Sequence, residues 1–294
     1  MRFGIATIGL SAALCAAAIA VAQPPAPDTG SDIVVEGRRI GQSEIGDFIS
    51  ALSDVRADDH VARFEFDACP FAAGLSAEHN ALVSARMRAV GRAAGVSIAD
   101  PPCRPNAIII ATRDSRATIA DLRRHFPQLF LGLSVRQVDR LALHESPISW
   151  HIAQYVDQDG RPLTPDRETG AIPVGSASGA SRLTPLVRPY LAGAVLVVDS
   201  RTIEGTTPRQ LADYAAMRLF AKTDPSKLGG VSAPTILRLL EAPPGRPMPV
   251  TLTHFDLGYL RALYATPPNR FANSQRFLMR RQMLRDLQGR EVGD

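Results

Sequence analysis

Two cysteines are the residues best suited to chemistry in the part of the chain that we expect to fold. Residues 1–22 start with a positive charge, continue as an apolar run and end in a small-x-small pattern at Ala22, which predicts a cleaved signal peptide. Cleavage leaves Cys69 and Cys103, and an even pair in an oxidising compartment predicts a disulfide. A metal site and a reactive thiol are the alternatives, but the pair has no Cys-x-x-Cys spacing and no neighbouring histidine.

Two aspartates are the candidate residues for a polar pocket. Asp199 follows the apolar run 194–198, which predicts a buried strand, and α/β sheets often bind ligands at the carboxyl ends of their strands. Asp213 lies on the helix predicted next along the chain. Two acids without a partner are equally typical of helix caps and surface groups, so the pair suggests a pocket without defining a reaction.

The sequence motifs of several enzyme classes are missing. His144 and Glu145 start no metalloprotease motif, because Pro147 would break the helix that such a motif needs. Residues 175–179 have alanine at the nucleophile position of a serine-hydrolase elbow. Phosphate loops, dinucleotide fingerprints and EF-hand loops are absent from the sequence, and its six histidines share no ligand spacing. We therefore predict no catalytic residue, no metal ligand and no cofactor.

Two charged segments have a binding interpretation beside a structural one. An acidic stretch before Cys69 has the oxygen ligands of a hard-cation site, or is simply the solvated start of a strand. Arginines on the last predicted helix either contact anionic lipid or lipopolysaccharide, or form the wet side of an amphipathic helix. The acids are Asp54, Asp58, Asp59, Glu65 and Asp67, and the arginines are Arg276, Arg280, Arg281 and Arg285.

A β-prone run at 32–39 is suited to docking on a partner. It contains Ile33, Val34 and Val35 and follows a Pro- and Gly-rich linker, so it resembles segments that add as a strand to a partner's sheet edge. Over this short run it is similar to the TonB boxes near the mature N-termini of outer-membrane receptors. An edge strand of the chain's own domain is the alternative.

The elements expected around these residues alternate between strands and helices. Residues 106–112 have the pattern of a strand buried on both faces, and a long loop at 161–184 is expected to be mobile. The order predicts one α/β or α+β domain over 45–290, with a small buried sheet and a helical C-terminal third, after a flexible linker at 23–44. Strands are predicted at 60–66, 106–112, 148–156 and 194–198, and helices at 46–53, 76–95, 115–126, 134–144, 207–221, 232–240, 253–264 and 274–287.

Composition and charge are those of an ordinary globular protein, with 45% hydrophobic and 21% charged residues. The net charge of +4 is small for 294 residues, and no aromatic-basic motif accompanies it, so nucleic-acid binding is not predicted. No later apolar run approaches the roughly 20 residues of a membrane span, so we expect no transmembrane segment in the mature chain.

Several stretches resemble uncharacterised exported proteins of alphaproteobacteria, of the sphingomonad type. The C-terminal part is also similar in layout to a secreted zincin-like family, in which the helix after the last strand bears a His/Glu metal motif. The matching helix here, 208–221, has Asp213 and Tyr214 but no histidine, so the resemblance implies a scaffold kept without its metal. The stretches are 62–65 with Cys69 and Pro70, 74–75, Cys103 with Asn106, 210–218, 235–237 and 252–264.

These observations predict a mature chain that is periplasmic or secreted. They favour a periplasmic, non-enzymatic protein that binds a partner or an envelope component, the partner being an unidentified envelope protein. A zincin-like hydrolase with an unrecognised or degenerate site is the alternative.

Overall fold

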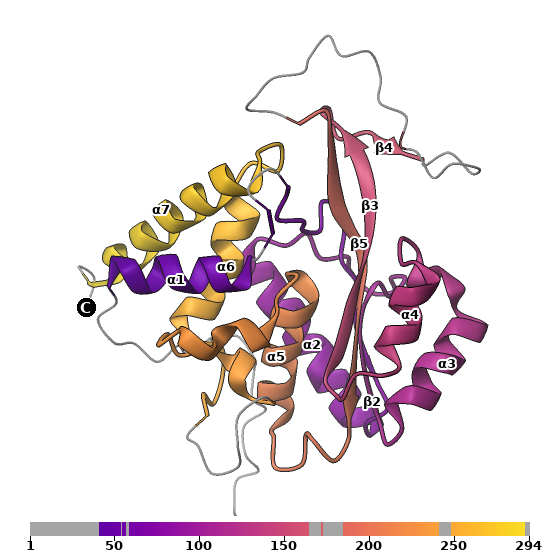
Figure 1. Ribbon diagram of the computed structural model, residues 1–294. Coiled ribbons are helices and arrows are strands. Elements are labelled where there is room, and N and C mark those ends of the chain that lie inside the picture. The colour runs from indigo at the N-terminus through magenta and orange to yellow at the C-terminus, as the bar shows by residue number, and fades with distance from the viewer. Residues whose placement is uncertain are drawn as a thin grey trace, which may run out of the picture.

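A five-stranded mixed sheet with helices on both faces forms the centre of the protein (Figure 1). The computed structural model describes residues 41–53, 55–56, 59–164, 172, 185–240 and 248–291. The expected fold class, α/β or α+β with a helical C-terminal region, is confirmed. The elements are α1 (Gln42–Leu52), β1 (Pro70–Ala73), α2 (Ala77–Ala94), β2 (Ala107–Thr112), α3 (Ser115–His125), the 3-10 turn η1 (Pro127–Phe130), α4 (Val135–Leu141), β3 (Ile148–Asp157), β4 (Pro162–Leu163), β5 (Val187–Asp199), α5 (Pro208–Phe220), the 3-10 turns η2 (Pro225–Gly230) and η3 (Ile236–Arg238), α6 (His254–Ala265) and α7 (Ala272–Glu291).

The strand order is β1-β2-β5-β3-β4, and β1, β2 and β5 run parallel. β3 is antiparallel to both β5 and β4. β5 lies at the centre because its alternating apolar residues bury both faces of the strand. Val195 and Val197 contact the core under α3 and α4, whereas Leu196 and Val198 contact the core under α2, α5 and α6.

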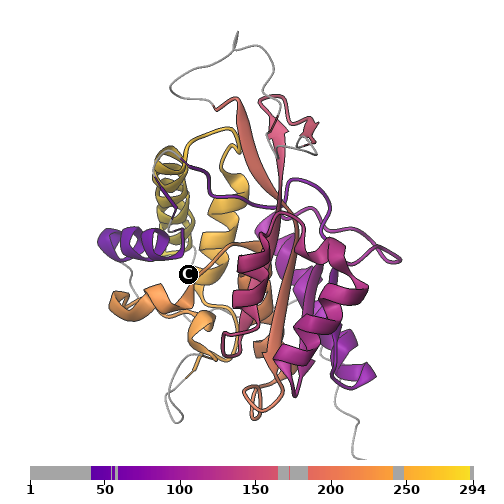
Figure 2. The same ribbon diagram turned by 45° about the vertical axis from the view of Figure 1, so that its right-hand side comes forward.

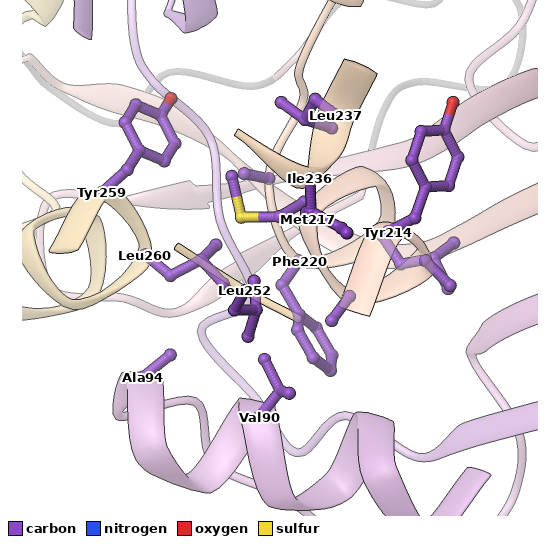
Figure 3. Close-up of a cluster of buried hydrophobic side chains, with 14 of the residues drawn as sticks. Val90, Ala94, Tyr214, Met217, Phe220, Ile236, Leu237, Leu252, Tyr259 and Leu260 are labelled. Atoms are coloured by element: carbon purple, nitrogen blue, oxygen red, sulfur yellow. The ribbon is translucent and has the colours of Figure 1, made fainter. Parts of the chain in front are cut away.

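The larger core lies on the α2, α5 and α6 face of the sheet, and Figure 3 shows part of it. Val90 and Ala94 of α2 point towards Phe220 and Met217 of α5, and Leu252, from the segment just before α6, lies beside them. Figure 2 brings α3 and α4 forward, where they cover the opposite face over a smaller core that includes Trp150. Among the described residues, no helix combines the length and apolarity needed to span a bilayer.

Helices with complete local signals form where they are predicted. Ser76 caps α2 by accepting a hydrogen bond from the backbone of His79, and Gly95 ends it with a φ of 84°. Thr253 and Asp256 form a capping box at the start of α6. The predicted disulfide is present, with the Cα atoms of Cys69 and Cys103 6.0 Å apart. It joins the segments that lead into β1 and β2, two neighbouring parallel strands.

The strand predicted at 60–66 is wrong. This segment is extended, but its backbone groups bind side chains of the C-terminal helices: Gln275 accepts from the Val61 amide at 2.8 Å, and the Tyr264 hydroxyl accepts from the Phe64 amide at 3.3 Å. The first described strand, β1, begins only at Pro70, after the end of the predicted strand. The Arg63 carbonyl accepts from the Leu191 amide of β5 at 2.8 Å, but side chains of α6 and α7 bind the Val61 and Phe64 amides.

Smaller expectations at element ends also need correction. Asp114 caps α3 just before the predicted start at 115, and α7 begins at Ala272, two residues before its predicted start. The helix predicted at 232–240 is only the single turn η3, because Asp256 accepts from the Ile236 amide at 2.9 Å and fixes it locally. The middle of β2 is buried on one face only, since its alternate residues remain partly exposed.

Candidate binding site

Asp213, one of the two predicted pocket residues, lies in the core of the molecule and not on a surface. It projects from α5 towards Arg86 of α2, whose Nε donates to Oδ1 at 2.7 Å and whose Nη2 donates to Oδ2 at 3.2 Å. Oδ2 also accepts from the Thr251 hydroxyl at 2.6 Å and from the Leu252 amide at 2.9 Å. The Asp213 side chain is fully buried and that of Arg86 is 7% exposed, so this network joins α2, α5 and the segment that leads into α6.

Asp199, the other predicted pocket residue, stands at the end of β5 and has different partners. Arg201 donates to its carboxylate from Nη2 at 2.6 Å and from its own backbone amide at 2.8 Å. These hydrogen bonds lower the pKa of Asp199 to about 2. Among the described residues, Asp199 and Asp213 share no hydrogen-bond partner.

A groove of about 520 Å³ lies between the C-terminal end of α2 and the helix pair α6 and α7. A second cavity of about 200 Å³ shares two lining residues with it, Ala265 and Gln282. The volume of the larger cavity is within the range of small-ligand sites. Neither Asp199 nor Asp213 lines either cavity. We call the two cavities together the α2–α6–α7 groove; its larger cavity is lined by Arg92, Ala93, Ala94, Gly95, Arg261, Tyr264, Ala265, Gln282 and Asp286.

The polar groups of this groove are held by neighbours. Arg261 donates from Nε to the Ala93 carbonyl at 2.9 Å, which binds α6 to the C-terminal end of α2. Gln282 donates to the carboxylate of Asp286, one turn further along α7, at 2.8 Å. The groove therefore presents cations, an amide and a carboxylate in fixed positions, an arrangement suited to binding a polar ligand.

Ser149 and His151 form a polar cluster with α5 that sequence reasoning missed. Arg218 donates to the hydroxyls of both Ser149 and Tyr214. A guanidinium cannot accept a proton, so Arg218 cannot act as a base that activates Ser149. The Nε2 atom of His151 is buried and has no hydrogen-bond partner among the described residues. Burial, and then the nearby charges of Lys222 and Arg218, lower the pKa of His151 to about 3. Ser149 and His151 are two residues apart on β3, so strand alternation places them on the same face. This alternation is the sequence signal that could have grouped them.

The four arginines of the last helix do not form one surface. Arg276 donates to the Ser53 carbonyl at 2.8 Å and to that of Val55 at 2.9 Å. The guanidinium of Arg280 packs over Gly46 of α1. Of the other two, Arg281 stacks on the Phe277 ring, 5.9 Å from its centroid, and Arg285 donates to Gln282.

The acidic stretch is also divided among separate contacts. Glu65 forms a bidentate ion pair with Arg188 of β5, at 2.7 and 3.0 Å, and Asp67 accepts from the Ser97 hydroxyl. The carboxylate of Asp59 accepts from the His60 amide at 2.8 Å, whereas Asp54 and Asp58 lie outside the described residues. Within the described ranges, no group of three or more His, Cys, Asp and Glu side chains is placed to hold a metal ion.

Two further predictions lie outside the described residues. These are the signal peptide at 1–22 and the docking segment with Ile33, Val34 and Val35, together with all of the linker except 41–44. α1 begins at Gln42, inside the range that we assigned to the linker. Of the loop at 161–184, only 161–164 and Ile172 are described before the chain continues at Pro185, and β4 lies in it.

Comparison with known proteins finds no match to this chain among family models, curated proteins or solved structures. The function proposed below therefore depends on the sequence and on the contacts of the site itself.

Proposed function

We propose that this chain is exported to the periplasm and acts by binding a partner or envelope component, not by catalysis. The signal-peptide pattern of residues 1–22 supports export. The bond between Cys69 and Cys103 supports an oxidising compartment, since such bonds are rare in the cytosol.

The contacts of Asp213 carry the proposal. α5 follows β5, the last strand among the described residues, and so matches in order the helix that bears the metal motif in the zincin-like family that the sequence resembles. On this helix the carboxylate of Asp213 accepts from a guanidinium, a hydroxyl and a backbone amide. The cation beside it is Arg86. Both carboxylate oxygens accept hydrogen bonds inside the core, and the Asp213 side chain has no exposed surface. The contacts of Asp213 on this helix therefore support a structural role and not a metal-binding one.

The α2–α6–α7 groove is the ligand site that we propose. Its residues come from three helices whose packing is fixed by buried apolar contacts, so the site is formed before any ligand arrives. The segment with Ile33, Val34 and Val35 is a second proposed contact, in which it adds as a strand to a partner's sheet.

Zinc content separates this proposal from the alternative of a zincin-like hydrolase. We expect elemental analysis of the mature protein purified from periplasm to find far less than one zinc per chain. Stoichiometric zinc would overturn the proposal and restore the hydrolase.

Crosslinked pull-downs from envelope extracts test the two contacts. Ala265→Trp fills the groove, and Ala120→Trp places the same ring on an exposed position of α3 as a control. We expect the first variant, but not the second, to lose its crosslinked component. An unchanged partner list after deletion of residues 32–39 would remove the docking segment from the proposal.

A further inference from the structure

Residues 126–135, the connection between α3 and α4 together with the first residue of α4, carry several exposed apolar side chains. Phe126, Leu131 and Val135 are 50%, 52% and 64% exposed, and all lie within ten residues. Their closeness in the chain makes this segment a candidate contact site, because soluble proteins use exposed apolar patches for contacts. We call these three residues the α3–α4 apolar tip.

The buried side of the same connection holds the tip rigidly. Phe130 is buried and stacks on Trp150 of β3, with the ring centroids 5.1 Å apart, and the Trp150 indole donates to the Leu129 carbonyl at 2.8 Å. Gly132 has a φ of 81°, and a Cβ there would lie 3.1 Å from the Ala153 carbonyl oxygen, so the chain passes close to β3. The exposed side chains are therefore presented on a fixed support, which reduces the entropy lost on contact.

The charge around the tip favours an anionic surface. From Ser115 to His144 the chain carries five arginines and two aspartates, a formal charge of +3. Arg123 pairs with Asp139 at 2.9 Å, and Arg124 pairs with Asp121. Within the described part of the chain, the exposed Arg136 and Arg140 have no carboxylate partner. Arginines beside exposed apolar side chains are the combination that binds anionic lipid interfaces.

The size of the tip favours lipid over a protein partner. Three half-exposed side chains offer on the order of 300 Å² of apolar surface, whereas a stable protein partner covers about 800 Å² on each side. Figure 1 places α3 and α4 on the side of the sheet away from α1, α6 and α7, so this contact would leave the groove open.

We propose that the α3–α4 apolar tip is a peripheral membrane-contact site for the anionic headgroup layer of a bilayer. The inference rests on the proposed export to the envelope, and it does not depend on which ligand the groove binds.

Vesicle co-sedimentation of the disulfide-bonded mature chain tests the site. We expect binding to vesicles of phosphatidylethanolamine and phosphatidylglycerol, little binding to vesicles of phosphatidylcholine, and weaker binding at high salt. The variant Phe126→Ser/Leu131→Ser should bind the anionic vesicles at least about tenfold more weakly. Phe277→Ser is the matched control, because Phe277 is an equally exposed aromatic beside an arginine on α7.

Three results would overturn the inference. They are absence of wild-type binding to anionic vesicles, an unchanged affinity of the tip variant with native circular dichroism, and a loss caused by Phe277→Ser instead. A protein crosslink that depends on Phe126 without vesicle binding would identify a protein interface and also exclude lipid. None of these results changes the zinc content, so failure here is distinct from failure of the proposed function.

Discussion

The buried pair of Arg86 and Asp213 should behave as one structural unit when either residue is replaced. Arg86→Met leaves a carboxylate in the core, and Asp213→Asn leaves a guanidinium there without its counter-charge. Breaking a buried pair by removing one partner costs about 3–5 kcal/mol, because the remaining charge stays away from water. We expect this cost for each single variant, because the pair is almost completely buried and its two hydrogen bonds are 2.7 and 3.2 Å long.

The double variant should be much less destabilised than the sum of the single variants. Methionine at position 86 and asparagine at position 213 leave no buried charge, and the amide oxygen of the asparagine still accepts from Thr251 and Leu252. We therefore expect a coupling free energy of about 2 kcal/mol or more.

Urea unfolding followed by circular dichroism at 222 nm measures each corner of this cycle. Arg92 and Asp100 supply the control cycle, because they form a pair at 2.9 Å whose side chains are 53% and 90% exposed. That pair should contribute less than about 1 kcal/mol. Additivity of the Arg86 and Asp213 variants within about 0.5 kcal/mol would refute the reasoning.

Three further predictions follow from single features of the structure. The loop closed by Cys69 and Cys103 has a sequence separation of 34, so the double alanine variant should lose about 4 kcal/mol in urea unfolding; an equal midpoint with and without the bond would contradict this. His151 takes up a proton near pH 6.5 in the unfolded chain but only near pH 3 in the folded chain. The free energy of unfolding should therefore be unaffected by His151 above pH 6.5 and should fall as the pH is lowered from 6.5 towards 3. About 2 kcal/mol should be lost by pH 5, and His151→Asn should remove that loss from the pH dependence of unfolding. Gly74→Ala should be far more destabilising in thermal melts than Gly205→Ala, because both have positive φ but only the Cβ at 74 would lie 1.9 Å from the Ala111 carbonyl oxygen; equal losses would be inconsistent with this close approach.

Local sequence signals predicted the elements that depend on few neighbours. Ser76, Gly95 and the Thr253–Asp256 box mark their helices through contacts made within four residues. The alternating apolar residues of β5 predict burial without knowledge of the helices that cover the strand.

The expectations that failed depend on residues far apart in the sequence. Residues 60–66 have a strand-like pattern, but Gln275 binds their backbone from 214 positions away. Asp213 suggested a pocket because its partner Arg86 lies 127 positions earlier, on a helix whose packing no local pattern reveals. A carboxylate has the same sequence appearance in a pocket and in a buried ion pair, so only the folded structure distinguishes them.

Export into an oxidising compartment is the central claim, and the intact mass of the protein isolated from a periplasmic fraction tests it most directly. We predict a chain that begins at Gln23 and takes up no thiol reagent when it is denatured without reductant, because Cys15 has been removed and the two remaining cysteines are bonded. Recovery of the uncleaved chain from the cytosol, with Cys69 and Cys103 both reactive, would contradict the account.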